Sequence, residues 1–184
     1  MSKKIVMVLA SGFEEAEAVM TADVLRRLGF DLVLAGLYDI NVIGAHDIKI
    51  TADAVLAELD TADFDAVVLP GGMPGSMNLR NSDELMEFTS AVYNGGGVAA
   101  AICAAPIALA RFGLTDGKTI TAYPGFEEYL NGNVPTGCMT EIDGRIVTGK
   151  GPGASFEFAA CIAEALGEGD KVAKILKGMF INEF

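Results

Sequence analysis

One cysteine lies where its thiol could act as a nucleophile. Cys103 follows the small apolar segment Val98–Ile102 and precedes residues 104–112, which have the composition of a helix. Pro106 suits the first turn of that helix because its φ is fixed near the helical value. A thiol at a helix N-terminus faces unpaired N–H groups and the positive end of the helix dipole, which stabilise a thiolate. We therefore expect Cys103 to be reactive, with a thiol pKa below the ordinary value of about 8.5.

The alternative for Cys103 is a role as an apolar filler, because cysteine is among the most often buried residue types. That interpretation fits the other two cysteines better, since Cys161 lies on the apolar face of residues 155–166 and Cys138 precedes a hairpin. The three cysteines match no zinc-binding spacing. We expect free thiols, no metal and no cofactor, as in a reducing, cytoplasmic environment.

Glu17 is the second residue with a chemical role. Residues 14–28 read as a helix, which turns by about 100° per residue. Four apolar residues fall on the same side of that helix as Glu17, namely Phe13, Met20, Val24 and Leu28. An acid in the middle of an apolar stripe should be buried, and burial raises the pKa of a carboxylic acid. We expect Glu17 to be protonated near neutral pH and to serve the chemistry of the site.

The neighbouring acids are predicted to have a structural role. Acidic residues favour the first turn of a helix because of its dipole, and this explanation suits Glu14 and Glu15. Glu15 is predicted on the solvent-exposed side of the helix, together with Arg26. The same explanation is the alternative for Glu17, but it does not account for the apolar side on which Glu17 lies.

The chain of 184 residues alternates between strand and helix patterns, which predicts an α/β fold. Strands are expected at 4–10, 31–35, 66–69, 98–102 and 119–122, and helices at 14–28, 82–93, 104–112, 155–166 and 170–176. Asp143-Gly144 predicts a hairpin between 139–142 and 145–148. Repeated βα units predict a flavodoxin-like three-layer sandwich, a mostly parallel sheet with helices on both faces. We expect one domain over residues 1–184.

Three of the predicted strands end in unusual residues. The first runs into residues 12–17, the third into Gly71-Gly72 and the fourth into Cys103. In open α/β sheets, ligands bind outside the carboxyl ends of the strands, so these loops should form one crevice. The N–H groups of Gly72 and Ala104 would then form an oxyanion site. A simple turn at the two glycines is the alternative.

The charge and the apolar segments exclude several partners. Lys and Arg total 13 against 25 Asp and Glu, a net charge of −12, which repels phosphate backbones and anionic lipids. The longest apolar stretch, 98–110, is shorter than the ~20 residues of a membrane-spanning helix. We expect neither nucleic acid nor membrane as a partner. The one histidine, His46, lies in the irregular stretch 38–53 and is predicted at the surface, so no Cys-His pair is expected.

Four segments in order resemble the DJ-one/ThiJ/PfpI superfamily, in the branch of the parkinsonism-associated protein deglycase. They are GFEEAE at 12–17, VLPGG at 68–72, AAICAAP at 100–106 and GPGASFEFA at 151–159. The resemblance implies a flavodoxin-like sandwich, a homodimer and a reactive Cys103. It also implies a protonated Glu17 bonded to the sulfur, with the N–H groups of Gly72 and Ala104 around the pocket.

The chain departs from the family at one position. Several branches carry a histidine beside the proline that follows the fifth strand, where this chain has Tyr123-Pro124. A phenol with an ordinary pKa near 10 does not replace imidazole as a base at neutral pH. Tyr123 is therefore expected to shape the pocket or donate a hydrogen bond, and peptidase or amidase activity is not expected.

The resemblance implies two functions for a stress-related protein. In the first, Cys103 attacks a small reactive carbonyl in a glyoxalase- or deglycase-like reaction, with Glu17 shuttling the proton. In the second, Cys103 is a redox sensor that peroxide oxidises to a sulfinate. Two alternatives stay open: a module that binds a small anion, and a cysteine hydrolase or amidotransferase-like protein without a histidine base.

Overall fold

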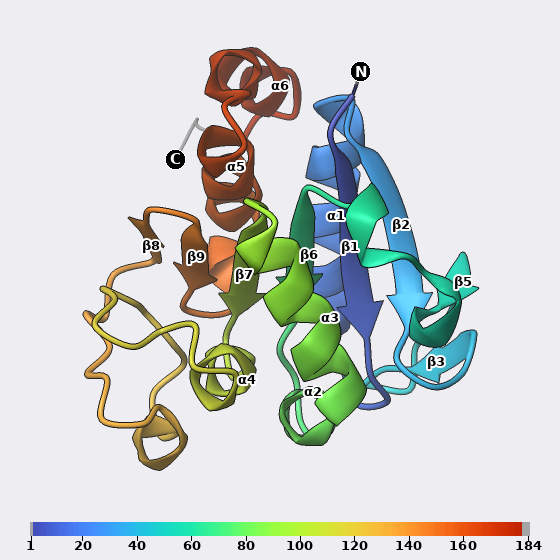
Figure 1. Cartoon of the computed structure of the whole chain (residues 1–184). Helices are drawn as coiled ribbons and strands as arrows, with labels where there is room; N and C mark the ends of the chain where they lie inside the picture. The colour runs from blue at the N-terminus through green and yellow to red at the C-terminus, as the bar shows by residue number, and fades with distance from the viewer. Residues whose placement is uncertain (1, 182–184) are drawn as a thin grey trace.

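The computed structural model describes residues 2–181. Within them, seven strands form one sheet in the order β5-β2-β1-β6-β7-β9-β8 (Figure 1). The strands are β1 Lys4–Leu9, β2 Asp31–Gly36, β5 Ala54–Val55, β6 Ala66–Leu69, β7 Val98–Ile102, β8 Thr140–Asp143 and β9 Ile146–Gly149. All neighbours pair in parallel except β8, which is antiparallel to β9. A separate antiparallel hairpin joins β3 Asn41–Ile43 to β4 Lys49–Thr51.

Helices cover both faces of the sheet (Figure 1). They are α1 Glu15–Arg27, α2 Gly75–Asn81, α3 Asp83–Asn94, α4 Pro106–Arg111, α5 Ser155–Ala165 and α6 Val172–Gly178. Short 3₁₀ turns lie at Leu56–Glu58, Thr61–Asp63, Glu127–Tyr129, Pro152–Ala154 and Gly169–Lys171. Helix α1 packs against α5 on one face, and α2 packs against α4 on the other. This arrangement is the predicted flavodoxin-like three-layer sandwich.

The alternation of side chains along β1 explains the two cores. Val6 and Val8 face the core under α2, α3 and α4, whereas Ile5, Met7 and Leu9 face the core under α1 and α5. All five side chains are fully buried, because a parallel strand between two helical layers contacts no water on either face. The continuous apolar run in this part of the sequence therefore specifies a central strand.

Two local predictions have different outcomes. The hairpin is confirmed, but its turn lies one residue later than predicted, because Asp143 pairs with Ile146 and the turn residues are Gly144 and Arg145. Gly144 has a φ of 63°, a value that glycine adopts without strain. The prediction of a strand at 119–122 is wrong, because hydrogen bonds to side chains replace the backbone ladder of a strand there. The N–H of Thr121 donates to Thr148 Oγ1 at 2.9 Å, and its hydroxyl donates to the Cys138 carbonyl at 2.7 Å.

None of the helices formed by residues 2–181 combines the length and the apolar composition required to cross a membrane.

Candidate functional site

The loops that follow β1, β6 and β7 meet at the carboxyl edge of the sheet, as the sequence analysis expected. These three strands are neighbours in the sheet. The N–H of Glu14 donates to the Gly71 carbonyl at 2.8 Å, and the N–H of Gly75 donates to the Gly12 carbonyl at 3.2 Å. The backbone itself therefore joins the loop after β1 to the loop after β6.

Cys103 lies in the turn between β7 and α4. Its φ is 64°, in the left-handed region that residues other than glycine rarely adopt. Two backbone hydrogen bonds hold it there: its N–H donates to the Gly149 carbonyl, and its carbonyl accepts from the Tyr123 N–H, both at 2.8 Å. The helix begins at Pro106 rather than directly after Cys103, so the predicted start at residue 104 is two residues too early. The turn places the cysteine ahead of the helix, with its backbone constrained on both sides.

Glu17 is fully buried on α1 and faces Cys103. Its Oε2 accepts the Gly71 N–H at 2.7 Å, while Oε1 is buried without a fixed hydrogen bond among the described residues. Burial raises the pKa of Glu17 to about 7, against the opposing effects of Cys103 and the Gly71 N–H. The predicted burial and the direction of the predicted pKa shift are thus confirmed.

The thiol of Cys103 does not have the lowered pKa that the sequence predicted. Burial raises the pKa of Cys103 to about 12, and the nearby charge of Glu17 acts in the same direction. The N–H groups of Ala104 and Gly72 donate to the sulfur and only partly oppose this. The prediction considered the helix N-terminus alone and omitted the cost of burying a thiolate beside a carboxylate.

The two glycines after β6 are required by close packing around these side chains. Gly72 has a φ of 91°, and a Cβ there would lie 2.3 Å from the backbone nitrogen of Glu14. At Gly71, a Cβ would lie 2.6 Å from Cys103 Cβ and 2.6 Å from Glu17 Oε2. No real side chain makes contacts this short, so glycine at both positions is what allows the backbone to approach the pair.

Tyr123 is next to Cys103 through the backbone, but its ring points elsewhere. The side chain is 48% exposed, and its Cδ2 atom lies 3.4 Å from the position of a Cβ on Gly151. The ring therefore packs beside the loop after β9. The structure brings Cys103, Glu17, Gly72 and Ala104 together, whereas Tyr123 borders the group.

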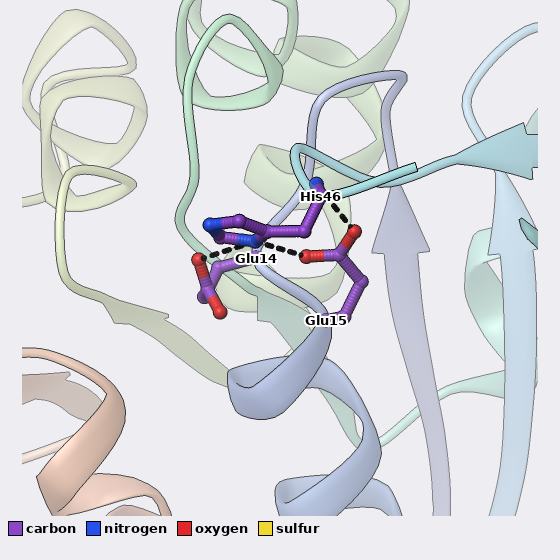
Figure 2. A group of neighbouring side chains, drawn as sticks. All are labelled: Glu14, Glu15 and His46. Carbon is purple, nitrogen blue, oxygen red and sulfur yellow. Dashed lines mark hydrogen bonds and ion pairs between the residues drawn. The ribbon is translucent and has the colours of Figure 1, made fainter. Parts of the chain in front are cut away.

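Sequence analysis missed a cluster on the loop between β3 and β4. Glu15 is only 5% exposed, so its predicted position in solvent is wrong. Its Oε1 accepts the N–H of His46 at 2.7 Å and that of Ile48 at 3.4 Å, and its Oε2 lies 2.8 Å from His46 Nδ1 (Figure 2). The loop covers the carboxylate and satisfies both of its oxygens. No local pattern signals this, because the partners are about thirty residues away in the chain.

The pKa values of this cluster reflect the pairing. Although burial raises the pKa of Glu15, the hydrogen bonds from His46 and the loop N–H groups bring it below its usual value. The hydrogen bond to Glu15 and the charge of Glu14 raise the pKa of His46. Ligand atoms of Glu14, Glu15 and His46 lie within 4.8 Å of one another, a spacing that a metal ion could bridge. Because both oxygens of Glu15 already have protein partners, these contacts explain the cluster without an ion.

The other cysteines lie apart from this group. Cys138 is exposed, and Cys161 is partly buried on α5, where burial raises its pKa. All three thiols are free among the described residues, as expected.

Comparison with known proteins identifies the family. A sequence model of the DJ-1/PfpI family matches residues 3–165. The chain belongs to the DJ-1/PfpI family. Protein dj-1beta of Drosophila melanogaster is 40% identical over 185 residues, which cover 98% of each chain. Another family member, the Caenorhabditis elegans protein named glutathione-independent glyoxalase DJR-1.2, is 33% identical over 89% of this chain and 88% of its own length.

Solved DJ-1/PfpI structures share the fold throughout. The structure described as Toxoplasma gondii DJ-1, oxidized, has a TM-score of 0.92 and 30% identity. The match covers 98% of this chain and 100% of that one. The sandwich is therefore a fold that this chain shares with its family.

Proposed function

We propose that this chain converts small α-oxoaldehydes without a cofactor, in a glyoxalase- or deglycase-like reaction, with Cys103 as nucleophile and Glu17 as proton shuttle. The observation that carries the proposal is the contact between a buried carboxyl group and a constrained cysteine across Gly71. A relative that covers most of this chain is named a glutathione-independent glyoxalase, which supports the same reaction class.

The proton on the pair decides whether a nucleophile is available. The first proton leaves the pair with an apparent pKa of about 7 and the second with one of about 12, values that belong to the pair. In the singly charged state, the remaining proton is either on sulfur or on Glu17. Burial and the charge of Glu17 make the thiol–carboxylate form the main one, and the N–H groups of Gly72 and Ala104, which donate to the sulfur, stabilise a minor form with the charge on sulfur. That form is a thiolate beside a carboxylic acid.

The reaction follows from this form. The thiolate adds to the aldehyde carbon, and the carbonyl oxygen takes the proton of Glu17, which gives a hemithioacetal. Glu17 then carries a proton from this carbon to the neighbouring ketone carbon, with rearrangement to a thioester of an α-hydroxy acid. Water hydrolyses the thioester and restores the thiol. Tyr123 takes no part as a base, so peptides and glutamine are not substrates.

A second candidate function is redox sensing at the same sulfur. Thiolate and peroxide give a sulfenate, and a second peroxide gives a sulfinate. In this candidate function, the N–H groups of Gly72 and Ala104 and the proton of Glu17 would donate to such oxygens. The oxidized Toxoplasma relative supports this candidate.

Methylglyoxal turnover by the purified protein tests the proposal. Cys103→Ser should abolish conversion, and Glu17→Gln should lower it by about 10²–10⁴-fold, the usual effect of a general acid–base. Cys138→Ser is the matched control and should retain the wild-type rate, because Cys138 is exposed and outside the pair. Turnover that survives Cys103→Ser would refute the assignment of Cys103 as the nucleophile. A protein with neither turnover nor oxidation at Cys103 would instead be a module that binds a small anion.

We further propose that the chain forms a homodimer, as the resemblance implied. Exposed apolar side chains on α1 and on the β3–β4 hairpin support it, with Val19 at 51% and Ile48 at 55% exposure. Light scattering should give twice the chain mass, and Val19→Lys should shift it toward the monomer. A monomer at all concentrations would refute this proposal.

A further inference from the structure

A shallow cavity of about 220 Å³ adjoins the backbone of Cys103 at the carboxyl edge of the sheet. The cavity is lined by Tyr123, Pro124, Met139, Lys150, Gly151, Pro152 and Gly153. We call this cavity, as defined by these residues, the side pocket. None of the residues assigned to the reaction lines it.

Backbone contacts place the side pocket next to the nucleophile. The Cys103 carbonyl accepts the N–H of Tyr123, which forms one wall. The Cys103 N–H donates to Gly149, and Lys150 and Gly151 follow directly in the chain. Two segments that are far apart in the sequence thus hold Cys103 between them and continue into the walls of the pocket.

The walls are apolar and the pocket has room for a ring. Lys150 is the charged residue of the lining, and its ammonium group is already bonded to the Gly137 carbonyl at 3.0 Å. A dry apolar cavity of about 150 Å³ is enough to bind benzene. Glycine keeps the space open, because a Cβ on Gly153 would lie 3.8 Å from Met139 Cε and a longer side chain would fill the pocket.

We propose that the side pocket binds the apolar substituent of the electrophile that reacts with Cys103, and that it favours aryl over small substituents. As a statement about turnover, the side-pocket proposal rests on the proposed function and names aryl-substituted α-oxoaldehydes as its substrate class. The polar oxoaldehyde group lies at Cys103 and Glu17, and the ring lies against Tyr123 and Met139. The selectivity itself requires only a reactive Cys103.

The first test compares phenylglyoxal with methylglyoxal. The wild type should have a kcat/KM ratio of at least about tenfold in favour of the aryl compound, the discrimination that small apolar pockets reach. Gly153→Leu should lower that ratio toward one. Ala173→Leu is the matched control, because Ala173 lines a different cavity between α5 and α6, and it should keep the wild-type ratio.

The second test is independent of turnover. Alkylation of Cys103 by 2-iodo-N-phenylacetamide and by iodoacetamide forms a C–S bond and releases iodide in both cases. After division by the rates with free cysteine, the wild type should favour the aryl reagent by at least about tenfold. Gly153→Leu should lose this preference and Ala173→Leu should keep it. Should Gly153→Leu misfold, Met139→Ala removes a wall at an exposed position and should also reduce the preference.

The two tests separate the two proposals. Aryl selectivity in alkylation without any oxoaldehyde turnover would uphold the side pocket and refute the proposed function. Turnover with equal alkylation rates in the wild type would refute the side pocket alone. A preference that Gly153→Leu and Met139→Ala both leave intact would also overturn it.

Discussion

The Oε2 atom of Glu17 and the Cβ atom of Cys103 both lie 2.6 Å from the point that a Cβ on Gly71 would occupy. The Gly71 N–H also donates to Glu17 Oε2 at 2.7 Å. One residue without a side chain therefore leaves space for the pair and fixes one oxygen of the acid. The other oxygen, Oε1, stays free of fixed hydrogen bonds among the described residues, which suits a group that transfers a proton.

Glu17→Gln should lower the thiol pKa of Cys103. Burial and the charge of Glu17 both raise this pKa, and glutamine removes only the charge. The ultraviolet absorbance of the thiolate reports the titration, in a background with Cys138 and Cys161 replaced by serine. An equal or higher thiol pKa in the glutamine variant would contradict the electrostatic contribution of Glu17.

The free energy of unfolding should fall as the pH rises through the titration of Glu17. Its pKa is 4.5 in the reference state and about 7 in the fold, so the native state holds more protons between these values. The stabilisation is complete below the lower pKa and is lost above the higher one. A shift of this size corresponds to about 3 kcal/mol. Urea unfolding across this pH range should show the fall in unfolding free energy in the wild type and not in Glu17→Gln. The same pH dependence of the unfolding free energy in both proteins would contradict this prediction.

Mild peroxide should oxidise Cys103 before the other cysteines and stop largely at the sulfinate. Glu17 can hold the proton that the thiol gives up when it becomes a thiolate, and two N–H groups donate to the sulfur. Peptide mass mapping after graded exposure gives the order of oxidation. Modification of the exposed Cys138 first would show that exposure, rather than thiolate character, controls the chemistry.

Glu15→Ala should loosen the loop between β3 and β4. The buried carboxylate accepts from the N–H groups of His46 and Ile48, and its loss leaves them without this partner. We expect a cost of about 1–3 kcal/mol in unfolding free energy, and faster hydrogen exchange at both amides. Glu14→Ala is the control and should leave the exchange of both amides unchanged, because Glu14 has no bond to either. Unchanged exchange in Glu15→Ala would contradict the role of the carboxylate.

Sequence patterns predicted those features of the site that depend on one element and its direct neighbours. Glu17 is buried because it lies on the apolar side of α1, and Cys103 is at the site because β7 ends there. Gly71 and Gly72 follow the next strand in the sheet, so the meeting of the loops follows from the strand order.

The remaining features depend on contacts between distant segments. Glu15 was predicted in solvent because its helix face is polar, but the loop that carries His46 folds over it. The thiol pKa was predicted from the helix N-terminus, whereas burial is its largest cause. Residues 119–122 have a strand-like composition, but the Thr148 hydroxyl takes the hydrogen bond at Thr121 that a strand would have supplied.

The left-handed backbone of Cys103 sets stability against activity at a single position. Any side chain other than that of glycine is strained at a φ of 64°, by roughly 1–2 kcal/mol. Glycine is free of this strain, so Cys103→Gly would relax the turn and remove the nucleophile in one step. Laboratory evolution of this chain for heat tolerance alone would therefore favour inactive variants, and selection for thermostability has to include a screen for the thiol.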